Sequence, residues 1–263
     1  MSIPVYQVDA FADKAFKGNP AAVCLLAEAE RSSWMQDVAR EMNLSETAFV
    51  WPDGDEFQIR WFTPEVEVEL CGHATLASAH VLFESGRLKP DRPARFHSHS
   101  GLLVAGHRGD FIEMDFPSKP PTPVKAPPRL AEALGLEPVY TGQNGSDYLA
   151  LFEREQDVRE MKPDMRLLRT METRGVCVTA HSEGHGFDFV SRFFAPAVGI
   201  PEDPVTGSAH CCLGPFWAGR LGKKELVGYQ ASARGGVVEV RVEGERVFLG
   251  GKAVTVLKGE LVA

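Results

Sequence analysis

The sequence predicts an α+β protein of two similar lobes, each a curled, mostly antiparallel sheet around one central helix. Three observations favour this class. A proline-rich connector, "PSKPPTPVKAPP" at 117–128, lies near the middle of the 263-residue chain. Each half contains one largely apolar helical segment, and several short sequences recur in the same order in both halves. The predicted lobes are residues 1–118 and 127–263, and the last strand is a candidate to cross to the first lobe.

The first half alternates strand and helix patterns. Apolar and polar residues alternate in "VYQVDAF", "FQIRWFT" and "FIEMDF", which predicts strands. Helical spacing predicts a helix over 31–43, with Ser32 or Ser33 as its N-cap. A second helix is predicted over 74–86 and ends at Gly86. Because this helix is apolar on nearly all sides, we expect it to be buried on nearly all sides.

The second half repeats this order. "PPRLAEALGL" predicts a short helix, and "GVCVTAHS", "FDFVSRFFAP", "VVEVRVEG" and "RVFLGGKAVTVLKGEL" predict strands. The counterpart of the first apolar helix is predicted over 208–220. Pro215 lies inside it, so we expect a kink or one missing backbone hydrogen bond.

The two halves match at nearly constant spacing, which favours an internal duplication. Chance similarity between two amphipathic segments is the alternative. The matches pair Trp61-Phe62 with Phe193-Phe194, Gly72-His73-Ala74 with Gly207-Ser208-Ala209, and Gly86-Arg87-Leu88 with Gly219-Arg220-Leu221.

Both apolar helices are predicted to start beside a glycine, Gly72 or Gly207. Unpaired N–H groups and the positive end of the helix dipole coincide at such a start, which suits an anionic group. A glycine there also lets a ligand approach the backbone. If a pseudo-twofold axis relates the lobes, both starts face one interlobe cleft; helix starts that face only solvent are the alternative.

Composition narrows the function classes. The net charge of −8 and pI of about 5.5 argue against a nucleic-acid partner. They do not exclude an acidic small-molecule substrate, because a local pocket can oppose the global charge. No apolar run is long enough to span a membrane. Five cysteines without a CxxC spacing indicate a reduced, cytoplasmic protein.

Motifs for common cofactors and hydrolases are missing from the sequence. There is no GxGxxG, GxxxxGK[ST] or GxSxG pattern. Cys71 and His73 are two residues apart without a second ligand pair, so we expect no metal site. Cofactor-free chemistry on a compact substrate is the expectation that follows.

Four polar residues are candidates for that chemistry. Glu46 lies among apolar neighbours in "NLSETAFV", where a carboxyl can exchange protons near neutral pH; a capping or surface glutamate is the alternative. His73, at the first helix start, can accept or donate a proton, and helix capping is its alternative. Asp203 and Ser208 lie near the second helix start, where both residue types commonly cap. His80 and His210 lie on apolar helices and are expected to pack.

Four segments carry a family resemblance: "VDAFADKAFKGNPAAV", "LSETAFV", "FTPEVEVELCGHATLA" and "GIPEDPVTGSAHCCLGPFW". Together they resemble the PhzF-like phenazine-biosynthesis isomerases, within the diaminopimelate epimerase-like fold. The resemblance spans nearly the whole chain. It implies two similar halves, a site between the lobes and a homodimer.

The resemblance also implies a reaction, a cofactor-free isomerisation of trans-2,3-dihydro-3-hydroxyanthranilate. A proton leaves one ring carbon and returns at another. By this resemblance Glu46 is the proton-shuttling acid and base. Substrate-binding positions are carried over in the same way: Gly72 and Gly207 through their backbone, with His73, Asp203, Thr206, Ser208 and Asn19.

Two other functions stay open at this point. Related epimerases and proline racemases use two opposed cysteines as acid and base. Cys71 stands where the first would be, but the second would fall near Val205, which has no thiol. A two-thiol epimerase or racemase is therefore disfavoured. The other alternative is a non-catalytic binding or scaffolding protein that retains the fold, since fold does not imply function.

Overall fold

A computed structural model describes residues 2–145, 147–184 and 186–262 of the chain. The chain forms two compact units: unit 1 is Met1–Asp115 with Gly250–Ala263, and unit 2 is Phe116–Leu249. Residues 250–263 belong to unit 1 because the last strand, β18 (Ala253–Leu261), pairs antiparallel with β1 (Ile3–Ala10). None of the helices in the described ranges has both the length and the apolar character needed to cross a bilayer.

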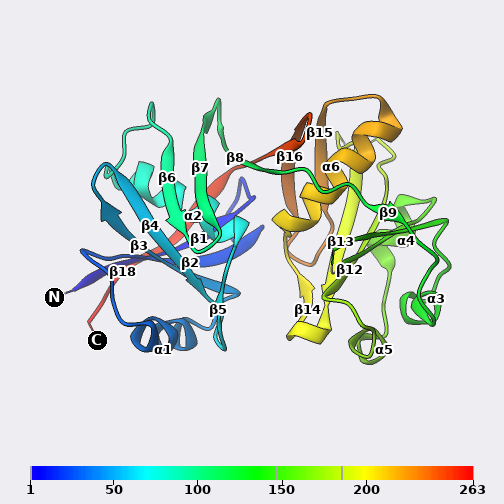
Figure 1. Ribbon diagram of the computed structural model, residues 1–263, viewed down its shortest axis with the longest axis horizontal. Coiled ribbons are helices and arrows are strands. Elements are labelled where there is room, and N and C mark those ends of the chain that lie inside the picture. Colours follow the sequence, from blue (N-terminus) through cyan, green and yellow to red (C-terminus); the bar gives the residue numbers. More distant parts are fainter. Residues whose placement is uncertain (1, 146, 185, 263) are drawn as a thin grey trace. The chain divides into compact units, whose positions relative to one another are not determined.

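Unit 1 is a curved sheet with helices on both faces (Figure 1). Its parallel pairs are β2–β3 and β4–β6, whereas β1–β2, β3–β4, β4–β5, β6–β7 and β7–β8 are antiparallel, as the mostly antiparallel prediction requires. Its remaining elements are β2 (Asn19–Leu25), α1 (Ser32–Met42), β3 (Glu46–Asp53), β4 (Glu56–Phe62), β5 (Glu67–Val68), α2 (Gly72–Glu84), β6 (Ala94–Ser98), β7 (Gly101–Arg108) and β8 (Phe111–Pro117), which continues into unit 2.

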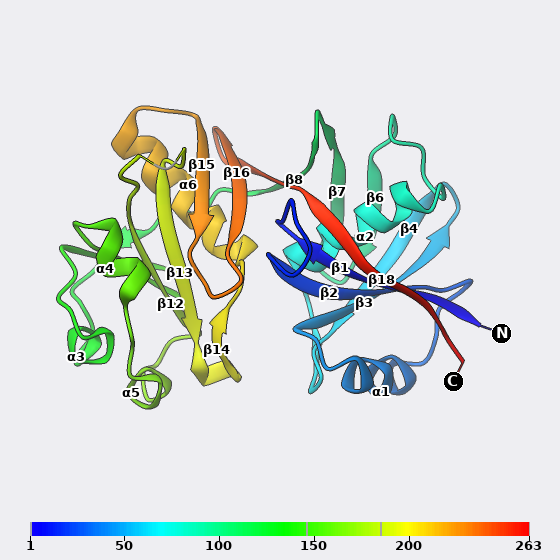
Figure 2. The same ribbon diagram turned by 180° about the vertical axis from the view of Figure 1, so that it is seen from behind.

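The central helix of unit 1 is α2, and it lies within the curve of the sheet in both views (Figures 1 and 2). It packs against β1, β2, β3, β7 and β18, and every residue from His73 to Leu82 is buried except the half-buried His80. The predicted buried helix is therefore confirmed. It begins at Gly72, earlier than predicted, and the left-handed φ of 71° at Gly86 follows its end.

The predicted cap of α1 is wrong. The helix begins at Ser32, and Arg31 occupies the N-cap without a side-chain hydrogen bond to the helix. The Ser32 hydroxyl instead accepts a hydrogen bond of 2.8 Å from Nη2 of Arg60 on β4. The Ser32 hydroxyl, which local sequence preference predicted as the helix cap, thus bonds a residue from another strand instead.

Unit 2 contains the remaining elements of the chain, except that the last two residues of β17, Gly250 and Gly251, belong to unit 1. The expected short helix "PPRLAEALGL" is present as α3. The elements are β9 (Thr122–Pro123), α3 (Leu130–Leu134), β10 (Tyr140–Asn144), β11 (Asp147–Leu151), α4 (Glu155–Glu160), α5 (Met165–Arg169), β12 (Gly175–His181), β13 (Phe189–Ala195), a 3-10 turn (Pro196–Val198), β14 (Ile200–Asp203), α6 (Gly207–Leu221), β15 (Glu225–Gln230), β16 (Gly236–Glu243) and β17 (Arg246–Gly251).

The strands of unit 2 pair in the same series of directions as those of unit 1. β10–β11 and β12–β13 are antiparallel, β11–β12 and β13–β15 are parallel, and β15–β16 is antiparallel. The short strand β14 pairs with β13 just before α6, as β5 pairs with β4 just before α2. Corresponding sequence segments therefore lie at corresponding places in the two sheets.

The central helix of unit 2, α6, accommodates Pro215 through a bond outside the helix. Proline lacks the N–H that would donate to the carbonyl four residues earlier, which is that of Cys211. This carbonyl accepts a hydrogen bond of 3.0 Å from the backbone N–H of Lys119. The predicted loss of one helical bond is thus offset by the segment that follows β8.

Candidate active site

The start of α2 places a histidine in a buried setting. Cys71 is the N-cap residue, in an extended conformation and without a side-chain cap bond. The N–H and hydroxyl of Thr75 both donate to the Cys71 carbonyl, at 3.1 and 2.6 Å, which fixes the first turn. The first turn then holds Gly72 and His73, and the His73 side chain is only 7% exposed.

Glu46 reaches this helix start from the sheet. It is the first residue of β3, and its neighbour on the parallel strand β2 is Ala21. Its Oε2 atom lies 3.1 Å from Nε2 of His73, and the Glu46 side chain is 12% exposed. Within the described residues, this buried oxygen accepts no hydrogen bond of regular geometry, so the contact with the ring is close but poorly aligned. The carboxylate is therefore held beside a potential charge while one oxygen keeps a lone pair available.

Cys71 completes a cluster of three titratable groups. Its Sγ lies 3.5 Å from Nδ1 of His73, and one donor atom each of Glu46, Cys71 and His73 lies within 4.8 Å of the others. Burial, reinforced by the negative charge of Glu46, raises the pKa of the Cys71 thiol. Burial opposes charging of the imidazole, but Cys71 and Glu46 outweigh it and raise the pKa of His73 well above its usual value. The charged form of the His73 ring is therefore favoured.

The same cluster has the nitrogen, sulfur and oxygen donors that metals such as zinc use. The prediction of no metal site considered only Cys71 and His73, because Glu46 lies far from them in the chain. Zinc binds the thiolate form of cysteine, so a metal bound here would displace the thiol proton that burial retains.

Asn19 lies at the same end of the sheet as Glu46. It is the buried first residue of β2, two positions before the Ala21 that neighbours Glu46. Gly18 before it has a φ of 63°, and a Cβ there would lie 2.0 Å from the Ala10 carbonyl oxygen. Only glycine fits this turn, which fixes where Asn19 enters the strand.

The start of α6 carries a different set of groups. Thr206 is the N-cap, and its hydroxyl donates to Oδ2 of Asp203 at 2.5 Å. Its N–H donates to Oε1 of the fully buried Gln230, at 2.9 Å. Nε2 of Gln230 donates in turn to the Asp203 carbonyl, at 2.7 Å. Gly207 and Ser208 follow as the first residues of the helix.

Ser208 also has a partner that sequence reasoning missed. Nη2 of Arg174 donates to its hydroxyl at 3.0 Å, and the same guanidinium makes a bidentate pair with Asp147. Asp147 arrives through the parallel pairing of β11 with β12, in which it lies opposite Gly175. No sequence motif singles out Arg174, Asp147 or Gln230.

The other candidate histidines pack, as expected. His210 is fully buried on α6, with Nδ1 2.8 Å from the Thr206 carbonyl oxygen. Burial lowers the pKa of His210 to about 4, so this ring is neutral at physiological pH. Nε2 of His80 lies 3.1 Å from the Thr255 hydroxyl, far along the chain, and burial lowers the pKa of His80.

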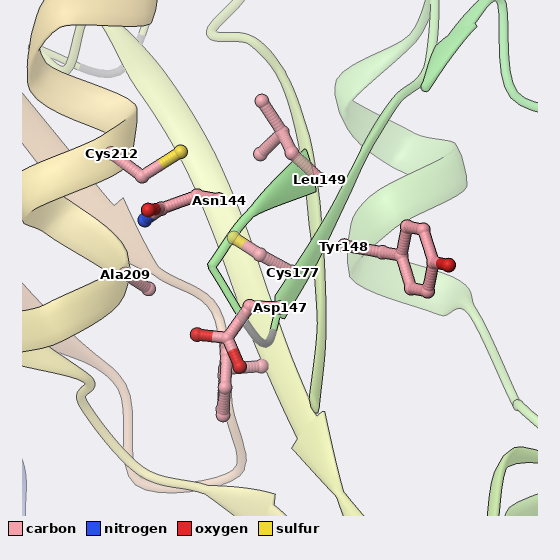
Figure 3. Close-up of a pocket in the computed structure, with 8 residues that line it drawn as sticks. Asn144, Asp147, Tyr148, Leu149, Cys177, Ala209 and Cys212 are labelled. Atoms are coloured by element: carbon pink, nitrogen blue, oxygen red, sulfur yellow. The ribbon is translucent and has the colours of Figure 1, made fainter. Parts of the chain in front are cut away.

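A narrow pocket in unit 2 adjoins this second helix start (Figure 3). It has room for about one water molecule. In Figure 3 the Asp147 carboxylate points from its strand toward the side on which Ala209 of α6 lies. Its lining residues are Asn144, Asp147, Tyr148, Leu149, Cys177, Phe193, Ala209 and Cys212. The pocket is too small to hold a substrate.

Known proteins match the chain over its whole length. A family described as "Phenazine biosynthesis-like protein" matches residues 8–259. A protein of Halalkalibacterium halodurans, named an uncharacterized isomerase, is 52% identical over 263 residues, which cover 100% of this chain and 99% of that protein. The crystal structure of a PhzF family protein from Enterococcus faecalis matches with a TM-score of 0.96 at 42% identity, over 100% of both chains.

A more distant structure shares the fold alone. A probable proline racemase from Agrobacterium radiobacter matches with a TM-score of 0.65 at 12% identity, covering 99% of this chain and 93% of the other. The α+β architecture is thus the one shared by PhzF proteins and proline racemases, which confirms the predicted diaminopimelate epimerase-like fold.

Proposed function

The chain belongs to the phenazine biosynthesis-like family and is an isomerase, and from this premise we propose that it moves a proton within a small carboxylated substrate. In this proposal Glu46 is the acid and base, and no cofactor takes part. The observation that carries the proposal is the position of Glu46: its Oε2 lies 3.1 Å from Nε2 of His73 and accepts no regular hydrogen bond in the described ranges.

The proton transfer proceeds in two steps. The Glu46 carboxylate removes a proton from a substrate carbon, and the electrons of the broken C–H bond move into the adjoining unsaturated system. The neutral carboxyl group then returns the proton to another carbon, so the product has the atoms of the substrate. The His73 ring, whose pKa is raised, places a positive charge beside this carboxyl group. Isomerisation of trans-2,3-dihydro-3-hydroxyanthranilate is the reaction of this class that the family resemblance suggests.

The remaining predicted residues are assigned to substrate binding. Gly72 and His73 offer backbone and ring donors beside Glu46, and Asn19 lies at the same end of the sheet. In unit 2 the corresponding groups are those of the α6 start: Asp203, Thr206, Gly207 and Ser208. The helix starts support this assignment, because neither N-cap residue makes a side-chain bond to the first turn.

An epimerase or racemase with a cysteine base is the second candidate activity, and Cys71 is the residue that favours it. Two observations oppose it. The raised pKa of the Cys71 thiol makes it a weak base near neutral pH. The second cysteine base of such an enzyme would lie near Val205, a fully buried residue without acid-base chemistry. The named isomerase relatives favour an enzyme over a non-catalytic binding or scaffolding protein.

We also propose that the chain acts as a homodimer in the cytoplasm. The homodimer is taken from the family resemblance. The cytoplasmic location is supported by the cysteines, all five of which are free and buried. Sedimentation velocity of the purified protein tests the first point, and a monomer at micromolar concentration would contradict it.

Deuterium uptake in heavy water tests the proposed chemistry. The protein would be mixed with trans-2,3-dihydro-3-hydroxyanthranilate and a panel of small unsaturated carboxylates and amino acids, and carbon-bound hydrogen would be followed by NMR. We expect E46Q to lower the exchange rate by about 10²- to 10⁴-fold, the usual contribution of a general acid or base. E65Q, which changes an exposed glutamate of the same unit, is the matched control. Equal exchange in wild type and E46Q would refute the role of Glu46.

A further inference from the structure

The guanidinium of Arg174 is fixed in place beside the first turn of α6. Nε donates to Oδ1 of Asp147 at 2.8 Å, and Nη2 donates to Oδ2 of the same carboxylate. The guanidinium carbon lies 5.4 Å from the centre of the Phe193 ring. Nη2 also donates to the Ser208 hydroxyl, at 3.0 Å. All four residues belong to unit 2, so this arrangement is a property of one compact unit.

These contacts leave a specific set of donors unused. Arginine can only donate hydrogen bonds, so the Ser208 oxygen is the acceptor in their bond. The hydroxyl proton of Ser208 is then directed elsewhere, and it has no acceptor within the described ranges. Nη1 of Arg174 likewise has no acceptor there, since Asp147 and Ser208 occupy Nε and Nη2. The unused groups are therefore all donors.

These donors can be reached from solvent. The Arg174 side chain is 40% exposed, whereas Asp147, which orients it, is 11% exposed. Ser208 is exposed as well. Asp203 is close enough to Arg174 to add a further negative charge to its surroundings. Asp147 orients the guanidinium through two hydrogen bonds, and a ligand that meets the remaining N–H groups must supply hydrogen-bond acceptors.

We propose that Arg174 and Ser208 together bind the carboxylate of the substrate. A carboxylate has two acceptor oxygens, which match the Nη1 end of the guanidinium and the Ser208 hydroxyl. Arg174 is thereby a substrate-binding residue that also sets the direction in which Ser208 donates. The proposal rests on the proposed function in so far as Ser208 binds substrate. It adds Arg174, and with it the side chains of unit 2 that hold the carboxylate.

Benzoate and its neutral analogue benzamide test the site without turnover. Each would be titrated into isotope-labelled E46Q, and amide and Arg Nε signals would be followed by NMR. We expect benzoate, and not benzamide, to shift the signals of Ser208 and Arg174 in a saturable way. We expect even weak carboxylate binding at this site to have a Kd below about 20 mM. The absence of a saturable shift with benzoate up to that concentration would overturn the proposal. Equal shifts with benzamide would overturn it too.

Variants separate this role from structural support. S208A removes only the exposed hydroxyl, and we expect about threefold weaker benzoate binding. The double variant R174M/D147N removes the cation without leaving a buried carboxylate unpaired, and we expect binding at least about tenfold weaker, the loss of a charge-assisted bond. R174K keeps the positive charge but loses the paired N–H donors of the guanidinium, so its benzoate affinity should lie between those of wild type and R174M/D147N. R166M, which removes an exposed cation from the same unit, is the matched control.

The outcomes also separate this site from the proton transfer. Wild-type affinity for benzoate in both S208A and R174K would refute the carboxylate site, even if R174M/D147N failed to fold. Selective benzoate binding in E46Q, combined with no deuterium uptake by wild type from any substrate, would refute the proposed reaction and leave the carboxylate site standing.

Discussion

The starts of α2 and α6 occupy corresponding places in their units but carry different chemistry. Each follows a short strand that pairs antiparallel with its neighbour, and each begins at a glycine. At α2 three titratable side chains, Glu46, Cys71 and His73, lie against one another, and Oε2 of Glu46 accepts no regular hydrogen bond in the described ranges. At α6 the buried groups form bonds of regular length with Gln230 as their centre.

This difference separates a site that exchanges protons from one that holds a ligand. Proton transfer needs titratable groups close to one another, which Glu46, Cys71 and His73 provide at α2. A binding surface needs donors whose directions are fixed, which the bonds to Gln230 and Arg174 provide at α6. We therefore expect variants at α6 to change stability and affinity, and variants at α2 to change rate and pH dependence.

The largest expected effect is the loss of the buried amide at α6. Q230L removes the partner of the Thr206 N–H and of the Asp203 carbonyl. Burying such groups without their partners costs about 1–3 kcal/mol each, so we expect the free energy of unfolding to fall by roughly 3 kcal/mol. Chemical denaturation followed by circular dichroism measures it.

Q143L is the control for this variant, because Gln143 makes one local bond to the Gly145 carbonyl. A surface change of that kind should stay within about 0.5 kcal/mol of wild type. Equal stabilities of Q230L and Q143L would show that the α6 start does not depend on its buried amide, and the contrast with α2 would fail.

Some residues of these two sites could be predicted from the sequence, and their positions in the chain explain why. Gly72, His73, Gly207 and Ser208 sit in short repeated segments, so the pattern alone located both helix starts. The segment "LSETAFV" identified Glu46 as a candidate, and strand β3 places its Oε2 atom 3.1 Å from Nε2 of His73. Both central helices were also predictable, because an apolar helix must be buried.

Residues outside the motifs were not predictable. Gln230 reaches α6 from the end of β15, and Asp147 reaches Arg174 only because β11 and β12 run parallel in a particular register. The cap expected at Ser32 failed for the same reason, since a distant arginine took the hydroxyl. Long-range pairing decides such contacts, and local sequence patterns do not contain it.

The second expected effect concerns His73. H73Q removes the charge beside Glu46, and we expect proton exchange to fall by about 10²-fold, at the lower end of acid-base contributions. The pH dependence of stability should also change. A raised folded-state pKa stabilises the protein fully below the unfolded value of about 6.5, and the gain is lost as pH rises through the folded-state value. The melting temperature of wild type should therefore fall toward that of H73Q as pH rises above about 6.5.

H210Q is the counterpart at α6. The low pKa of His210 means that its neutral ring gains no such stabilisation, so the difference between wild type and H210Q should stay constant above pH 6.5. A pH-independent difference for H73Q as well would contradict the charged state assigned to His73.

The third prediction concerns how closely the central helices approach their sheets. A Cβ at Gly214 of α6 would lie 2.8 Å from Cγ1 of Val240, whereas a Cβ at Gly219 of the same helix would meet nothing within 4 Å. We expect G214A to destabilise the protein by about 1–2 kcal/mol through overpacking. G219A should be neutral or stabilising by up to about 1 kcal/mol, because alanine favours helix. Equal unfolding free energies for the two variants would contradict the tight packing of α6.

The smallest expected effect is at Cys71, and it decides between the two candidate activities. The thiol is buried and its pKa is raised, so it is a neutral neighbour of His73 rather than a base. We expect C71S to lower deuterium exchange by less than about tenfold, well below the loss in E46Q. C24S, which buries a hydroxyl elsewhere in unit 1, controls for lost stability. If C71S instead matched E46Q while C24S stayed active, the thiol would be an acid or base, and α2 would carry the epimerase chemistry that the raised pKa of Cys71 opposes.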